Sequence, residues 1–149
     1  PTKVEFLFKP AAAMQPRPLG RIASGGEMSR VMLAVHVVMG ERDAVSTLVF
    51  DEVDAGVGGA TATALAEVLA DLAKSHQVLV VTHLAQVAVY GDAHYVVRKT
   101  EGGQEEAPHT ELVAVEGAAR TEEIARMLSG SATDHSLAHA EELLRSTSR

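Results

Sequence analysis

The sequence predicts an α/β fold: a mostly parallel sheet flanked by helices, with added strands and helices toward the carboxyl end. Residues 47–50 and 77–82 are short runs of β-forming residues without polar alternation, a pattern that predicts strands buried on both faces of a parallel sheet. Between them, residues 60–74 carry apolar side chains at helical spacing, with Leu65, Val68, Leu69 and Leu72 on one face. The order strand, helix, strand is that of a parallel βαβ unit.

The composition is that of one domain, or part of one, with an aliphatic core. Of the 149 residues, 46% are hydrophobic but only 3% are aromatic, which argues against the stacking platforms of a single-stranded nucleic-acid binder. The net charge of -7 argues against a broad basic surface for DNA, and the absence of cysteine excludes disulfides and thiolate metal sites.

No targeting or membrane segment is recognisable in the sequence. It has no signal peptide and no uninterrupted apolar run of about 18 residues or more. We therefore expect a cytoplasmic protein with no membrane partner. The chain begins at Pro1, and we expect it to be a piece of a longer protein.

The remaining elements follow from periodicity and from helix-breaking residues. A helix is predicted from Met28 onward, and the helix of residues 120–128 is expected to turn Ile124, Met127 and Leu128 inward. The other expected elements are a strand over 4–8, a proline-rich loop over 10–18, a short helix over 84–90, strands over 93–99 and 111–116 joined by a solvated loop, and a final helix over about 131–145.

Two adjacent carboxylates, Asp51 and Glu52, directly follow the strand of residues 47–50. Ligands bind at the carboxyl ends of strands in open α/β sheets. One carboxylate there suits a hydrated Mg²⁺, and the other can accept a proton from an attacking water. The alternative is an exposed acidic turn in which Asp54 and Gly56 are ordinary turn formers.

Ser24-Gly25-Gly26-Glu27 stands at the amino end of the helix that continues from Met28. Ser24 and Glu27 fit a capping box, in which each side chain satisfies a backbone N–H of the first turn. Capping does not explain two glycines, which each cost about 1 kcal/mol in a helix relative to alanine. Because glycines leave backbone N–H groups bare, the sequence also predicts a phosphate site here.

His83 follows the strand of residues 77–82 and is expected at the same sheet edge as Asp51 and Glu52. The alternative is a surface or capping histidine. His135 and His139 lie four residues apart on the final helix, a spacing that also occurs in zinc sites. No third ligand is suggested, which favours a solvated helix face for that pair.

Together these motifs resemble the carboxyl-terminal half of an ABC-type ATPase head. Residues 23–30 resemble the signature motif, 47–52 a Walker B strand, 53–59 a D-loop and 82–84 the switch-histidine loop. The chain resembles the RecN family more closely still, the SMC-like bacterial proteins of DNA double-strand break repair. This resemblance is carried by the runs 22–27, 50–59, 81–88 and 123–130. Met28 departs from it, standing where the family usually has leucine.

The resemblance implies ATP and Mg²⁺ as cofactors and a role for each motif. Asp51 would help to hold Mg²⁺ through water. Glu52 would polarise the attacking water, and His83 would contact the γ-phosphate. Asp54 would lie at the seam of a head dimer. The nucleotide of the opposite head would be bound by Ser24, Gly25, Gly26 and Glu27.

The resemblance also implies partners, because Gly-x-x-x-x-Gly-Lys-Ser/Thr occurs nowhere in these residues. The Walker A loop would come from the amino-terminal half of the same protein, and ATP-bound heads would form a homodimer. DNA would be bound through the full-length assembly, placing it at the nucleoid. The segment alone is expected to be inactive. Two alternatives stay open: a non-catalytic dimerisation or DNA-loading module, and a metal-dependent nuclease or phosphatase built on Asp51, Glu52 and Asp54.

Overall fold

The computed structural model describes residues 4–9, 11–21, 24–40, 44–100 and 109–147. The chain forms two compact units, Pro1–Thr82 and His83–Arg149. Helices alternate with two-stranded sheets, one parallel and two antiparallel, which confirms the predicted α/β class. Within the described ranges, parallel pairing is confined to one pair of strands. No helix in those ranges is long and apolar enough to cross a membrane.

The first unit begins with a minimal antiparallel pair. Strand β1 (Leu7–Phe8) pairs with β2 (Arg17–Pro18), with Leu7 opposite Pro18. The strand expected over residues 4–8 is therefore shorter than predicted, and β2 forms within the segment expected to be a loop. Pro18 stands at the end of its strand, where a missing N–H is tolerated. The 3₁₀ turn η1 (Leu19–Arg21) follows.

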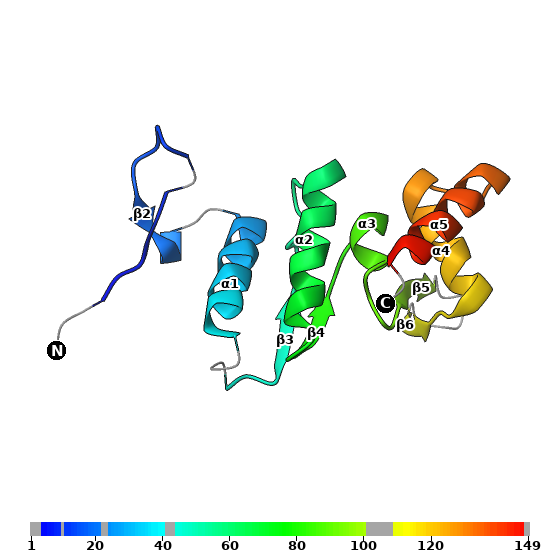
Figure 1. Ribbon diagram of the computed structural model, residues 1–149, viewed down its shortest axis with the longest axis horizontal. Coiled ribbons are helices and arrows are strands. Elements are labelled where there is room, and N and C mark those ends of the chain that lie inside the picture. Colours follow the sequence, from blue (N-terminus) through cyan, green and yellow to red (C-terminus); the bar gives the residue numbers. More distant parts are fainter. Residues whose placement is uncertain (1–3, 10, 22–23, 41–43, 101–108, 148–149) are drawn as a thin grey trace. The chain divides into compact units, whose positions relative to one another are not determined.

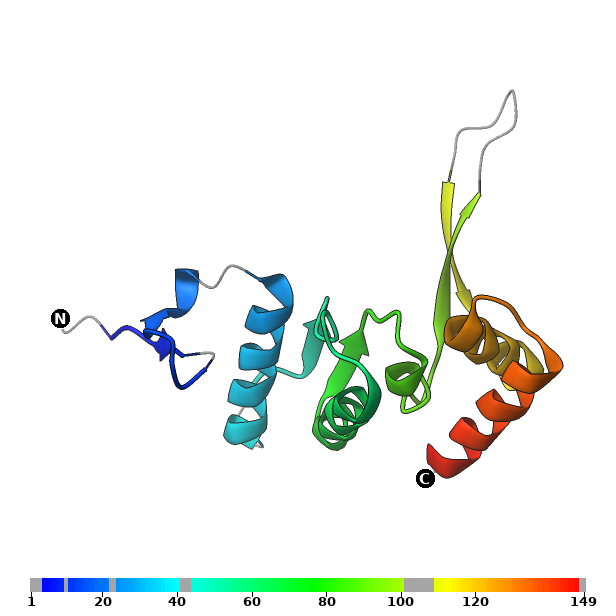
Figure 2. The same ribbon diagram turned by 90° about the horizontal axis from the view of Figure 1, so that it is seen from above.

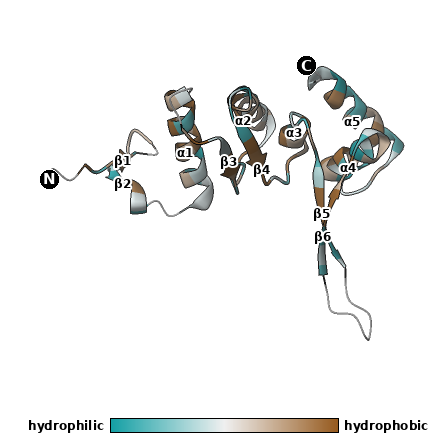
Figure 3. Cartoon of the chain, turned by 90° about the horizontal axis from the view of Figure 1, so that it is seen from below, coloured by the Kyte–Doolittle hydropathy of each residue, from teal (hydrophilic) through white to brown (hydrophobic). Residues whose placement is uncertain are grey.

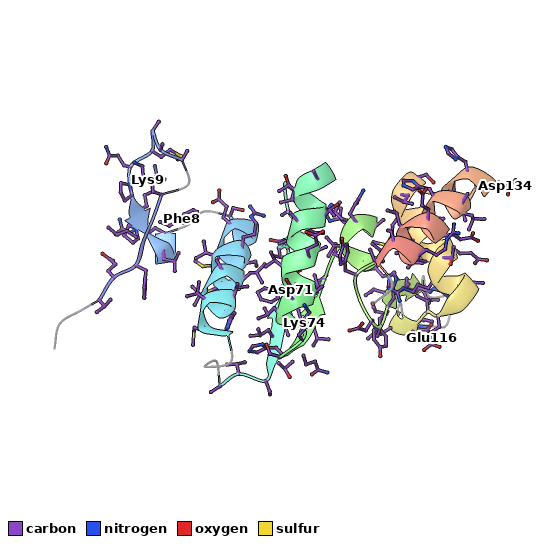
Figure 4. The ribbon with its side chains drawn as sticks, in the orientation of Figure 1. Phe8, Lys9, Asp71, Lys74, Glu116 and Asp134 are labelled. Carbon is purple, nitrogen blue, oxygen red and sulfur yellow. The ribbon has the colours of Figure 1, made fainter. Side chains whose placement is uncertain are left out.

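The predicted βαβ unit is confirmed (Figure 1). After α1 (Gly25–Met39) come β3 (Thr47–Phe50), α2 (Gly59–Leu72) and β4 (Gln77–Val80). The two strands pair in parallel with Thr47 opposite Gln77, and the Val81 N–H donates to the Phe50 carbonyl at 2.9 Å. Lys74 follows α2, and its Nζ lies 2.7 Å from Oδ1 of Asp71 in the last turn of that helix. The two side chains lie together in Figure 4.

The strand pair is buried on one face only, so the prediction of strands buried on both faces is wrong. Leu48 and Phe50 are 6% and 4% exposed, whereas Val49 is 65% exposed, and on the neighbouring strand Leu79 is 48% exposed. The physical reason is that the described helices cover one face. Helix α2 lies beside the strand pair (Figures 1 and 2), and the His36 ring of α1 meets the Phe50 ring edge-on with 6.4 Å between centroids. Val49 and Leu79 lie on the other face, which stays exposed.

Helix α2 buries a face slightly rotated from the predicted one. Leu69 and Leu72 are buried as expected, but Val68 is 40% exposed. Ala62 and Ala66 are fully buried in its place. These small side chains complete an i, i+4, i+7 stripe with Leu69.

In the second unit, helices pack against one another beside an antiparallel hairpin. It contains α3 (Ala85–Ala88), β5 (Tyr95–Thr100), β6 (His109–Ala114), α4 (Gly117–Ser129) and α5 (Asp134–Thr147). Figure 2 shows the hairpin extending away from α4 and α5. The loop expected to join its strands falls mainly on 101–108, outside the described residues.

The core of this unit is small and aliphatic, as predicted. Ile124 is completely buried, and Met127 and Leu128 are partly buried against the same cluster. His135 and His139 are both exposed on α5. The buried members of the cluster are Ala85, Val89, Ile124, Ala125 and Ala140.

A partly buried histidine makes the stability of the second unit sensitive to acid. Burial lowers the pKa of His94 below its ordinary value of 6.5, and the Arg120 guanidinium lowers this pKa further, while Glu123 opposes both. Among the described residues, His94 Nδ1 and Arg120 Nε are buried without hydrogen-bond partners. The neutral imidazole is therefore the form that the folded chain favours.

We expect the free energy of unfolding to be highest above pH 6.5 and to fall as the pH is lowered, because the unfolded chain then takes up the proton more readily. Urea unfolding between pH 7.5 and 5.5, about one unit either side of the ordinary histidine pKa, measures this slope. His94→Asn should flatten it, whereas His135→Asn, at an exposed position, should not. Equal slopes for the wild type and His94→Asn would contradict the assignment.

Candidate functional site

The amino end of α1 is capped as the sequence predicts. Ser24 has extended backbone angles, φ -114° and ψ 128°, and its Oγ accepts the Glu27 N–H at 3.4 Å. The Ser24 carbonyl accepts the Met28 N–H at 3.1 Å. The structure thus contains the Ser24 half of the capping box. The first N–H groups of a helix have no intrahelical acceptor and favour negative charge.

The two glycines of this helix end allow the turn after β3 to come very close. A Cβ placed on Gly25 would lie 2.6 Å from Glu52 Oε2. One placed on Gly26 would lie 2.7 Å from the Glu52 carbonyl oxygen and 2.9 Å from Ala55 Cβ. A side chain at Gly26 would collide with the turn itself, and one at Gly25 would displace the Glu52 carboxylate. The glycines therefore have a packing reason beside the ligand-binding reason that the sequence suggests.

The turn that carries the two carboxylates begins where β3 ends. Asp51 and Glu52 are both exposed. Glu52 has a φ of 56°, in the left-handed region, which costs a residue other than glycine about 1–3 kcal/mol and persists only where surrounding contacts impose it. The Glu52 carbonyl accepts the Ala55 N–H at 3.0 Å, which closes the turn.

Helix α1 supplies contacts that hold this turn. Ser29 Oγ donates to the Asp51 carbonyl at 2.7 Å. Arg30 Nη1 donates to the Val53 carbonyl at 3.1 Å and to the Ala55 carbonyl at 2.9 Å. Ser29 and Arg30 belong to residues 23–30, which resemble the signature motif, but the sequence alone assigns neither of them a role. A usable signal was that both are polar residues next to the apolar stripe of α1.

Asp54 lies inside the first unit. Its side chain is 2% exposed, and Thr82 Oγ1 donates a hydrogen bond to its Oδ2. Val53, just before it, is completely buried. Together these contacts anchor the turn to the segment after β4. The expectation that Asp54 lies at a dimer seam stays a prediction. Within the first unit its carboxylate is buried and accepts the Thr82 hydroxyl.

His83 is exposed and is the first residue of the second unit. Its predicted meeting with Asp51 and Glu52 stays a prediction. Thr82, the residue before it, is tied to the turn through Asp54.

The exposed carboxylates of the turn suit Mg²⁺, which keeps water ligands, better than they suit a metal that takes all its ligands from the protein. No group of three or more His, Cys, Asp or Glu side chains that could hold a metal occurs in the described parts of the chain. Mg²⁺ usually keeps several waters and takes only one or two carboxylates. The exposed Asp51 carboxylate, on a backbone held by Ser29, is a donor of that kind.

Comparison with known proteins gives close sequence relatives. No family model matches the chain. It is 51% identical over 149 residues to the DNA repair protein RecN of Treponema pallidum (strain Nichols), covering 98% of this chain and 25% of that protein. It is 54% identical over 127 residues to the DNA repair protein RecN of Deinococcus radiodurans, covering 85% of this chain and 22% of that protein. The chain thus spans about a quarter of these relatives.

One solved structure supports the fold. It comes from work on the structural biochemistry of ATP-driven dimerization and DNA-stimulated activation of SMC ATPases, and it aligns with a TM-score of 0.50. The alignment covers 77% of this chain and 66% of that chain at 21% sequence identity. This similarity confirms the predicted lobe of an SMC-type ATPase head as the fold class.

Proposed function

Because this chain belongs to the RecN family, we propose that it is one part of the ATP-hydrolysing head of a DNA repair protein. The observation that carries the proposal is the close approach of Glu52 to the glycine-opened end of α1. The carboxylate proposed to activate water and the helix end proposed to bind the nucleotide of the opposite head would then be held next to each other. Full-length protein would couple ATP turnover to DNA tethering in double-strand break repair, in the cytoplasm at the nucleoid.

The residues of the turn and of α1 would divide the chemistry between them. Glu52 would accept a proton from the attacking water. Asp51 would hold Mg²⁺ through water, and bound Mg²⁺ would supply positive charge to the phosphates. His83 would contact the γ-phosphate. The nucleotide of the opposite head would be bound at the end of α1 by Ser24, Gly25, Gly26 and Glu27.

Each site would be completed by parts outside this segment. Trans-acting groups are common in phosphoryl transfer, where catalysis depends mainly on positioning and charge. We propose that the Walker A loop comes from the amino-terminal half of the same protein and that two ATP-bound heads form a symmetric dimer with two nucleotides between them.

The exposed apolar face of the β3–β4 pair supports the proposal that the amino-terminal half of the protein packs there. Val49, Leu79 and Val81 are 65%, 48% and 58% exposed, and Figure 3 shows both strands as strongly hydrophobic. A two-stranded sheet is marginal alone, and parallel strands are normally covered on both faces. Docking of the amino-terminal half would provide that cover.

The test is steady-state ATP hydrolysis by this segment alone, by the amino-terminal half alone, and by the two together. We expect turnover only in the mixture or in a fusion, because the β- and γ-phosphates lack their Walker A loop in the segment alone. Glu52→Gln in the mixture is the control for hydrolysis at this site.

Activity of the segment alone would mean that the phosphate site is misassigned. A complex without turnover would favour the non-catalytic dimerisation or DNA-loading module. Mg²⁺-dependent cleavage of nucleic acid by the segment alone would favour a nuclease.

A further inference from the structure

The carbonyl groups around Glu52 are held from one side by two neighbouring residues of α1. Ser29 Oγ bonds to the carbonyl of Asp51, just before Glu52. Arg30 Nη1 bonds to the carbonyls of Val53 and Ala55, just after it. The bonds join residues 22 to 25 positions apart in the chain, so they determine where the turn lies relative to the helix.

Arginine is well suited to this position. Its guanidinium is always charged, and its planar arrangement of donors loses little freedom for each hydrogen bond formed. Hydrogen bonds from a charged donor are stronger than neutral ones. Arg30 is only partly exposed, which limits competition from water.

The left-handed backbone of Glu52 shows why such contacts are needed. A residue with φ of 56° relaxes toward commoner backbone angles unless its neighbours prevent it. Relaxation would rotate the Glu52 side chain away from the end of α1, where its Oε2 lies close to Gly25. The bonds from Ser29 and Arg30 oppose that rotation at the residues on both sides.

We propose that Arg30, assisted by Ser29, is a positioning residue that holds in place the turn from which the Glu52 carboxylate acts. This inference rests on the proposed ATPase function and adds a residue to it. Arg30 contacts the turn and acts through Glu52. Its loss should therefore affect the chemical step far more than the binding of ATP.

The test is a double-mutant cycle of Arg30→Ala and Glu52→Gln in the full-length protein, with kcat and KM for ATP measured for all four proteins. Misplacement of a catalytic group by about 1 Å can cost about 100-fold in rate, so Arg30→Ala should lower kcat by about 10- to 100-fold. The KM for ATP should stay within about threefold. In the Glu52→Gln background, Arg30→Ala should change the remaining rate by less than about twofold, because residues that act as one unit are not additive.

The outcomes separate the inference from the function on which it rests. If Glu52→Gln turns over ATP at the wild-type rate, the proposed function is wrong. If Glu52→Gln is inactive but Arg30→Ala keeps the wild-type kcat, the function stands and the positioning role is overturned. An equal loss from Arg30→Ala in both backgrounds would likewise overturn it, since that result indicates an effect independent of Glu52.

Milder variants keep the inference testable if Arg30→Ala does not fold. Ser29→Ala removes one hydroxyl and should lower kcat by about 3- to 10-fold, close to the effect of one ordinary hydrogen bond. Arg30→Lys keeps the charge and should retain more activity than Arg30→Ala. Wild-type kcat in both Ser29→Ala and Arg30→Lys would overturn the proposal. Arg145→Ala, on the exposed end of α5, is the matched control and should leave kcat unchanged.

Discussion

Replacing Glu52 with glutamine in the full-length protein is expected to lower the rate of ATP hydrolysis by about 10²- to 10⁴-fold, the usual worth of a general base. Glutamine has nearly the same shape, so it keeps the contact with the end of α1 but cannot accept a proton. ATP binding and ATP-dependent association of heads should persist. Phosphate release measures the first effect, and light scattering with and without ATP measures the second.

Glu142→Gln is the matched control for this variant. Glu142 is exposed on α5 and belongs to the other unit, so the same chemical change there should leave turnover unchanged. Wild-type turnover in Glu52→Gln would remove Glu52 from the mechanism. Loss of ATP binding together with turnover would show that Glu52 holds the site together instead of acting on water.

Gly26→Ala is expected to lower the free energy of unfolding by about 1–3 kcal/mol, the usual cost of overpacking. In an unconstrained helix the same change would stabilise by about 1 kcal/mol, so the expected sign is reversed. The reason is that the new methyl group would meet the Glu52 carbonyl oxygen at 2.7 Å and Ala55 Cβ at 2.9 Å. Neither atom is the end of a flexible side chain. Urea unfolding of the full chain measures the difference.

Two other glycines provide comparisons for Gly26. A methyl group at Gly20 would meet nothing within 4 Å, so Gly20→Ala should leave stability nearly unchanged. At Gly25 the methyl group would meet only the Glu52 carboxylate, which can move away. Gly25→Ala should therefore reduce turnover with little effect on stability. If Gly26→Ala is as stable as Gly20→Ala, the helix end and the turn do not pack as closely as the structure shows.

Local rules of sequence were sufficient for much of the fold. The strand at 47–50, the strand predicted over 77–82 and found at 77–80, the helix between them and the cap at Ser24 follow from apolar runs, helical periodicity and first-turn hydrogen bonding. The positions of Asp51 and Glu52 at the end of a strand follow from the same patterns. All of these depend on residues within a few positions of one another.

Side-chain burial was predicted less well. Val49 was expected inside and is exposed, because burial depends on which other elements cover a face. Ala62 and Ala66 were overlooked on α2 because alanine is a weak hydrophobic signal, although its small size suits a closely packed surface. The sequence did not indicate the burial of Asp54, whose carboxylate accepts a bond from Thr82, 28 residues away.

By itself, the sequence determined the order of the elements from α1 onward, the helix cap and the motifs that identify the family, since each depends on neighbouring residues or on residue identity. Only the tertiary structure decided how the end of α1 meets the turn of Glu52. The contacts of Arg30 with Val53 and Ala55 join segments more than 20 residues apart, and they support the left-handed backbone of Glu52. Local propensity does not specify such contacts, because they form only when packing brings the two segments together.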